Sequence, residues 1–103
     1  MTLDPGLAGE LLFGDAPADA GSAAVSRLRP VRRTVFRDVP ERIAWRSRLS
    51  TYVVCADDQV VNPDLERAMA ARATTRRESP GGPNPMMTRP EAVTALIASL
   101  AQR

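Results

Sequence analysis

The feature that most constrains the fold of this sequence is a single strong β-strand signal at residues 51–55. These residues, Thr-Tyr-Val-Val-Cys, form a continuous run of β-branched and apolar side chains rather than an alternating pattern. A run of this kind is typical of a strand that is covered on both faces, as the strands of a parallel sheet are. The segment therefore favours an α/β fold built around a parallel sheet.

A helix is expected soon after this strand. Asn62 can cap its N-terminus and Pro63 suits its first position, while Asp64 and Glu66 suit the positive end of the helix dipole. The pattern predicts a helix that runs to about Ala73. One of its faces carries Leu65, Ala68, Met69 and Arg72.

The remainder of the C-terminal part predicts a second strand and a final helix. Residues 74–78 can form an edge strand parallel to the first, which would close a β-α-β unit by a right-handed crossover. Residues 79–87 are rich in proline and glycine and are expected to form a loop. Thr88 and Glu91 then predict a capping box for an amphipathic helix with the apolar positions Val93, Leu96, Ile97, Leu100 and Ala101.

Residues 1–48 predict helices and no clear strand. Leu7, Leu11 and Leu12 share one helical face. Asp15 can cap a second helix, with Pro17 in its first turn, and Pro30 bounds this helix. Residues 31–39 are expected to form a short extended segment or loop, followed by a helical turn near residues 41–45. The chain thus predicts about two parallel strands flanked by four helices.

The core of such a chain is expected to be thin. The sequence has only four aromatic residues and nine prolines among its 103 residues. A sheet of two strands is marginal in water, and small domains bury a smaller share of their surface than large ones do. We therefore expect the fold to be completed by oligomerisation.

The chemistry open to the chain is limited by the residue types that it lacks. It contains no histidine and no lysine, and its only cysteine is Cys55. These absences exclude a Ser-His-Asp or Cys-His triad within the chain, an internal disulfide and a zinc site that uses histidine. We therefore expect no metal and no cofactor.

Charge and hydropathy give expectations about partners and compartment. The fourteen arginines are balanced by twelve acidic residues and are scattered along the sequence, so nucleic-acid binding is not expected. No apolar run approaches the ~18 residues that a membrane span needs, and no secretory signal is recognisable. With a single cysteine, a cytoplasmic protein without a membrane partner is the expectation.

Several motifs together resemble a known family. Residues 50–58 precede a helix of the form Pro-Asp-Leu-x-x-x-Met-Ala-x-x-Ala, and residues 79–91 read Ser-Pro-Gly-Gly-Pro-Asn-Pro-Met-Met-Thr-Arg-Pro-Glu. This order resembles the C-terminal part of small bacterial α/β-hydrolase-fold esterases, the group of salicylate esterases and hydroxynitrile lyases. The resemblance implies one truncated α/β-hydrolase-like domain over residues 1–103. Residues 1–48 would be a helical part derived from the family's cap, and residues 49–103 a C-terminal β-α-β-α part of its core.

The resemblance also implies where catalytic residues would have been. Asp58 takes the position of the family's catalytic acid, at the end of a strand. Pro83 takes the position of the catalytic histidine and has no side-chain base. The chain has no Gly-x-Ser-x-Gly nucleophile elbow, and the family's oxyanion-hole loop is absent from it.

Three functions are compatible with this reading. The first is a catalytically degenerate, non-hydrolytic structural or binding subunit that forms a homodimer or pairs with a complementary α/β-hydrolase chain. The second is a protein or non-hydrolytic enzyme of a secondary-metabolite pathway that binds a small apolar ligand. The third is an esterase half that is active only with a complementary N-terminal chain. For the second, a dimer could form a pocket from Phe36, Trp45, Tyr52, Asp57, Met86 and Met87.

Overall fold

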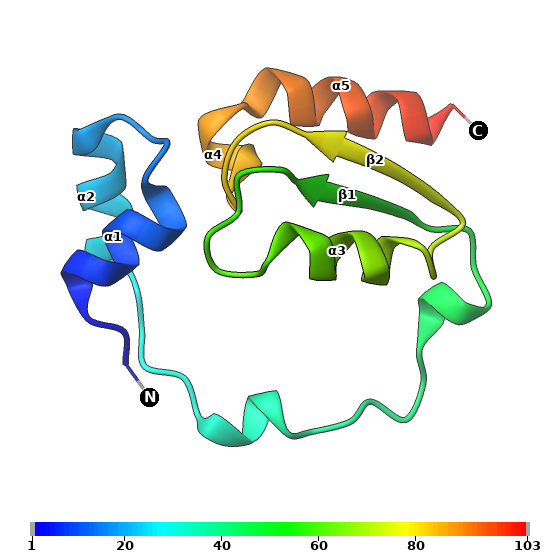
Figure 1. Cartoon of the computed structure of the whole chain (residues 1–103), viewed down its shortest axis with the longest axis horizontal. Helices are drawn as coiled ribbons and strands as arrows, with labels where there is room; N and C mark the ends of the chain where they lie inside the picture. Colours follow the sequence, from blue (N-terminus) through cyan, green and yellow to red (C-terminus); the bar gives the residue numbers. More distant parts are fainter. Residues whose placement is uncertain (1, 103) are drawn as a thin grey trace.

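The centre of the fold is a parallel sheet of two strands in a computed structural model that describes residues 2–102 (Figure 1). Strand β1 (Thr51–Cys55) pairs with β2 (Thr75–Ser79) in the register Thr51↔Thr75 to Cys55↔Ser79. Helix α3 (Pro63–Ala70) joins the two strands and packs on β1. The predicted β-α-β unit is therefore confirmed, and the chain is a small α/β structure.

Helix α3 begins as its sequence predicts but ends earlier. The Asn62 side chain accepts a hydrogen bond of 2.8 Å from the Asp64 N–H and so caps the helix. The helix ends at Ala70 rather than near Ala73. Reciprocal bonds between Ser50 and Thr74 explain this, since each backbone N–H donates to the other residue's hydroxyl and holds the start of β2 beside the start of β1.

The C-terminal segment contains two helices, α4 (Pro85–Thr88) and α5 (Pro90–Ala101). Helix α4 lies within the predicted loop. The predicted capping box is wrong, because the Thr88 hydroxyl donates to the Asn84 carbonyl inside α4 instead of capping α5. The N-cap position of α5 is Arg89, whose side chain makes no capping bond.

The N-terminal segment forms a helix pair of α1 (Pro5–Phe13) and α2 (Ala18–Ser26), which pack on each other. Asp4 caps α1 by accepting a 3.0 Å bond from the Leu7 N–H. We call residues 4–26 the helix pair. Two expected helices are confirmed here, although Pro17 rather than Asp15 stands at the N-cap of α2.

A long connector, residues 27–49, links the helix pair to β1. It contains two short 3₁₀ helices, η1 (Arg33–Phe36) and η2 (Ala44–Arg46). The first replaces the extended segment or loop expected at residues 31–39, and the second lies near the expected helical turn. Figure 1 shows the connector running beside the rest of the molecule as an open arc, and every residue in it except Ile43 is exposed.

The core of the chain is very small. Among the described residues the buried apolar side chains are Ala8, Val54, Cys55 and Ala70. The accessible surface is 8071 Å², whereas a compact monomer of 11.1 kDa exposes about 5,700 Å². The radius of gyration is 15.2 Å, against about 13 Å for a compact chain of this length.

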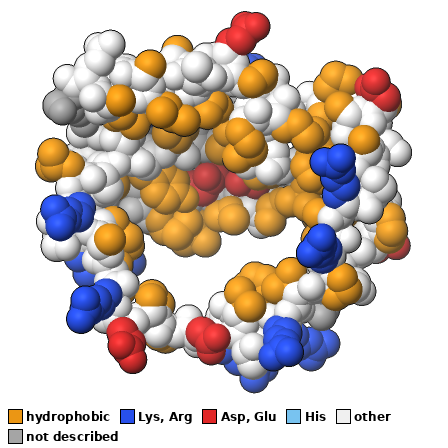
Figure 2. All heavy atoms as spheres, turned by 180° about the vertical axis from the view of Figure 1, so that it is seen from behind, with side chains coloured by type: hydrophobic (Ala, Val, Ile, Leu, Met, Phe, Trp, Pro, Cys, Tyr) orange, Lys and Arg blue, Asp and Glu red, His pale blue; other side chains and the backbone are white. Residues whose placement is uncertain are grey.

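The excess surface is partly apolar. Figure 2 shows hydrophobic side chains around an opening between the connector and the rest of the molecule.

In the described part of the chain, no helix is both long enough and apolar enough to cross a membrane.

Candidate functional site

The carboxyl end of the sheet is the natural place to look for a site, because open α/β folds bind ligands there. The segment after β1 and the loop after β2 hold each other at this end. The Asp57 N–H donates to the Gly81 carbonyl at 3.0 Å, and the Gly81 N–H donates to the Asp57 carboxylate at 2.7 Å. Gly81 has a φ of 96°, which side-chain-bearing residues rarely adopt.

The helix pair is tied to the same loop. The Gly82 N–H donates to the Asp15 carboxylate at 2.8 Å, and the Asn84 side-chain amide donates to the Leu12 carbonyl at 2.8 Å. Between the helix pair and the loop lies an open cavity of about 400 Å³, whose lining includes Asp15, Asp57 and Pro83. The carboxylates of Asp15 and Asp57 thus accept hydrogen bonds from backbone N–H groups and hold the loop after β2 in place.

Asp58, which the resemblance to the esterases would make a catalytic acid, is 8% exposed. Its carboxylate accepts bonds from the N–H groups of Val60 at 2.8 Å and Val61 at 3.0 Å, within its own turn. Pro83 lines the cavity but offers no proton acceptor in its side chain. The Asp58 carboxylate therefore stabilises a turn, and Pro83 gives it no imidazole to orient.

Glu66 is a buried carboxylate that the sequence interpretation did not single out. It lies on α3 with 5% exposure, and its Oε1 accepts the Cys55 N–H at 3.3 Å. Its Oε2 is buried and has no hydrogen-bond partner. Burial raises the pKa of Glu66, the nearby Asp58 raises it further, and the bond from Cys55 opposes the shift.

Burial also raises the pKa of two residues of β1, Cys55 and Tyr52. Burial raises the pKa of the Cys55 thiol, and the carboxylates of Glu66 and Asp58 add to the effect. A thiol with a raised pKa is protonated at neutral pH and is a poor nucleophile. Burial, followed by the charge of Glu66, likewise raises the pKa of Tyr52.

The six residues expected to form an apolar pocket lie in different places in one chain. Trp45 and Tyr52 line the same cavity of about 300 Å³, next to Met69. Asp57 lines the cavity at the end of the sheet instead. Met87 belongs to the short helix α4, and the exposed fractions of Phe36 on η1 and Met86 on α4 are 70% and 60%. A pocket shared between two copies stays a prediction.

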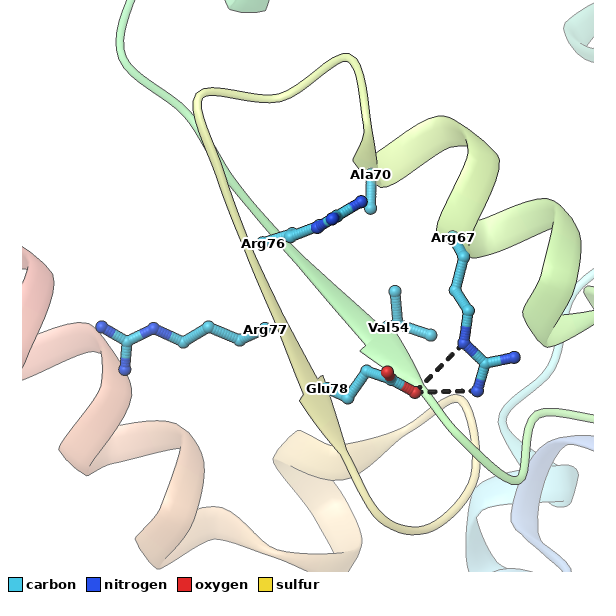
Figure 3. A pocket seen from close by; sticks show the side chains of 6 residues that line it. All are labelled: Val54, Arg67, Ala70, Arg76, Arg77 and Glu78. Atoms are coloured by element: carbon cyan, nitrogen blue, oxygen red, sulfur yellow. Dashed lines mark hydrogen bonds and ion pairs between the residues drawn. The ribbon is translucent and has the colours of Figure 1, made fainter.

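A third cavity, of about 410 Å³, lies between α3 and β2 (Figure 3). Arg67 reaches from α3 across this cavity to the Glu78 carboxylate at 2.8 Å and also contacts Asp64 at 2.9 Å. The Arg76 side chain lies near α3, whereas Arg77 points to the opposite side of the sheet. Because Arg67 on α3 binds the Glu78 carboxylate on β2, it links the helix to the strand at this cavity.

The connector carries most of the positive charge of the chain. Eight of the fourteen arginines lie in it: Arg27, Arg29, Arg32, Arg33, Arg37, Arg42, Arg46 and Arg48. The Arg46 guanidinium lies over the Trp45 ring at 5.6 Å from its centre. Both ion pairs found among residues 2–102 belong to Arg67, so none of these eight arginines pairs with a carboxylate there.

Histidine, cysteine, aspartate and glutamate do not gather into any group of three that could hold a metal ion within the described part of the chain. Comparisons with protein-family models, with curated proteins and with solved structures found no match.

Proposed function

We propose that this chain is a non-hydrolytic structural or binding subunit, of α/β-hydrolase-like ancestry, whose core is completed by association with another chain. The observation that carries the proposal is the excess surface of roughly 2,400 Å² over that of a compact monomer. Each partner in a large obligate interface buries about 1,000–2,500 Å². The excess is therefore of the size that a permanent interface removes.

The kind of surface left open supports the same proposal. Large hydrophobic side chains with exposed fractions above 50% include Phe36, Val39, Leu49 and Ile97. Extensive exposed apolar surface marks interaction sites in soluble proteins. A partner that covers these side chains would supply the missing core.

The free edge of β1 is a second open feature. The Thr75 N–H donates to the Ser50 carbonyl, and the Ala56 N–H donates to the Ser79 carbonyl. In a parallel ladder, these two bonds mean that the backbone N–H and C=O groups of the even-numbered residues of β1 point toward β2. Those of the odd-numbered residues point away from β2. Glu66 covers the outward N–H of Cys55, while the outward groups of Val53 have no partner in the described structure. An edge of this kind can pair with a strand of another chain.

The residues present support a non-hydrolytic role. A serine nucleophile needs a base, and the chain has no histidine and no lysine to provide one. The Asp58 carboxylate is engaged by the turn that it caps. Residues 51–101 contain a strand, a helix, a second strand and then the helices α4 and α5. This order supports the proposed ancestry, since the family's C-terminal part ends in a strand, a helix, a strand and a final helix.

The test of this proposal is the mass of the purified protein, measured by light scattering at micromolar concentration. The proposal expects at least twice the monomer mass of 11.1 kDa, or a stable complex with a complementary α/β-hydrolase chain. A folded monomer with no tendency to associate, alone or with such a chain, would contradict it.

The cavity shared by Trp45 and Tyr52 favours one alternative, a subunit that binds a small apolar ligand. Because Trp45 is the only tryptophan, its fluorescence reports directly on this cavity. Titration with small aromatic esters and their acids tests the alternative, which requires a saturable change in Trp45 emission that Tyr52→Ala weakens. An unchanged emission spectrum would reject it.

A further inference from the structure

Charge is segregated along this chain in a way that matches two of its structural segments. The helix pair carries four acidic residues and no arginine, which gives it a net charge of −4. The connector carries eight arginines and two acidic residues, which gives it a net charge of +6. The two surfaces are therefore opposite in sign.

No ion pair joins these charges to each other within the part of the chain that the structure describes. Among residues 2–102 the ion pairs both involve Arg67, which lies in neither segment. Asp4 and Asp15 accept hydrogen bonds from backbone N–H groups, and Glu10 and Asp19 are exposed and form no ion pair with any described residue. Unpaired charges of opposite sign on two exposed surfaces are complementary to each other between molecules.

The two surfaces are also complementary in shape, because the connector presents apolar side chains and the helix pair contains a groove. The connector presents Phe36 and Val39 among its arginines, with exposed fractions of 70% and 83%. The helix pair contains an open groove of about 660 Å³ between α1 and α2, whose lining includes Gly9, Phe13 and Val25. Small residues in this groove leave room for an inserted side chain, and the acidic Glu10 stands in its lining.

We propose that the connector of one copy binds the acidic helix pair of a second copy, with Phe36 in the groove and the flanking arginines opposite Glu10 and Asp19. In a two-fold symmetric dimer this contact occurs twice, since each copy offers both surfaces. The inference rests on the proposed function, because it names the partner and the surface through which the subunit associates. A second copy is the favoured occupant because the chain itself supplies both complementary surfaces and enough open area for a permanent interface.

A charge-swap experiment tests this contact. The connector variant carries Arg32→Glu and Arg33→Glu, and the helix variant carries Glu10→Arg and Asp19→Arg. Each variant alone places like charges together in both contacts, so its dimer dissociation constant, measured by sedimentation equilibrium, should rise about 10- to 100-fold. An equimolar mixture of the two variants should recover a dissociation constant within a few-fold of the unmodified protein, because both contacts are then attractive again.

Two controls make the result specific. Arg76→Glu with Arg77→Glu changes the net charge equally but outside the connector, and it should leave the dissociation constant within about threefold. Raising the salt from 0.1 M to 1 M shortens the screening length from about 10 Å to about 3 Å and should weaken the unmodified dimer. Circular dichroism checks that each variant keeps its helices.

Other outcomes would overturn the inference. If the mixture dimerises no better than either variant alone, the two surfaces do not meet between copies. If dimerisation is untouched while the connector variant loses binding to a labelled single-stranded oligonucleotide, the connector is a polyanion site instead. These outcomes leave the proposed function standing, whereas an unmodified protein that stays monomeric would reject the proposed function itself.

Discussion

Glu66 gives the sharpest test of the folded structure, through the substitution Glu66→Gln. The glutamine keeps an oxygen for the 3.3 Å bond from the Cys55 N–H and removes a negative charge that is 95% buried, since the residue is 5% exposed. It also places an N–H₂ group where the unpartnered Oε2 stands, near the Asp58 carboxylate. An unsatisfied buried polar group costs about 1–3 kcal/mol, so the variant should be more stable at pH 7 by about 1–2 kcal/mol.

The pH dependence follows from the direction of the pKa shift. The folded-state pKa of Glu66 is raised above its ordinary value of 4.5, mainly by burial. The folded state therefore binds a proton that the unfolded state has lost, and stability falls as pH rises from 4.5 through the folded-state pKa. Below pH 4.5 the carboxyl is protonated in both states, so the advantage of the glutamine should disappear there.

The assay is thermal unfolding followed by circular dichroism, from pH 4 to pH 8 at one protein concentration. Each kcal/mol corresponds to about 4–8 °C in Tm for a domain of this size. Glu91→Gln, an exposed change in the first turn of α5, is the matched control and should alter stability by less than about 0.5 kcal/mol. A Glu66→Gln protein that is less stable at pH 7, or whose advantage is the same at pH 4 and pH 8, would refute the reasoning.

Further expectations concern catalysis, the core and the free edge. The purified chain should not hydrolyse p-nitrophenyl acetate faster than an arginine-rich control protein does. Hydrolysis above that control, abolished by Asp58→Asn, would contradict this. Pro83→His should not restore activity, because a serine in a nucleophile elbow and the oxyanion donors are still lacking. Stoichiometric labelling of that variant by a fluorophosphonate would show otherwise. Val54→Ala should lower the free energy of unfolding by about 2–3 kcal/mol in urea titrations, since Val54 is 1% exposed, whereas Leu65→Ala, at 55% exposure, should cost less than about 1 kcal/mol. Amide exchange at Val53 should slow as protein concentration rises if partner chains cover the free edge of β1, and exchange independent of concentration would count against pairing there.

The β-α-β unit could be predicted because its signals are local. Five consecutive apolar or β-branched residues specify β1, and the Asn62–Pro63 start specifies α3. The parallel pairing then follows from the short connection through one helix. None of these inferences needs information from distant residues.

The buried face of α3 could not be predicted in the same way. Leu65 and Met69 mark an apolar face in the sequence, yet Glu66 and Ala70 are the buried residues of the helix and Leu65 is 55% exposed. The reason is tertiary: a bond from the Cys55 N–H places Glu66 at the open edge of β1. Glu66 and Ala70 are spaced four residues apart and so share one helical face. This spacing alone does not indicate that the face is buried.

The candidate site was predicted in position but not in arrangement. Asp57, Asp58 and Pro83 do lie at the carboxyl end of the sheet, as their places after the strands indicate. The donors that occupy these carboxylates, among them the Gly81 N–H, come from loops whose conformation no local pattern specifies. The positive charge of the connector was equally hidden, because its arginines can be assigned to one exposed segment only once the bounds of α2 and β1 are known.

A dilution series of melting curves tests most directly whether this chain completes its core by association. Folding and association are linked by mass action, so the Tm of such a protein depends on its concentration. We predict that Tm rises steadily over a hundredfold increase in protein concentration, together with the mass measured by light scattering. A monomer whose Tm stays the same over that range would show that the chain is stable with its 8071 Å² of surface exposed, and the claim would be wrong.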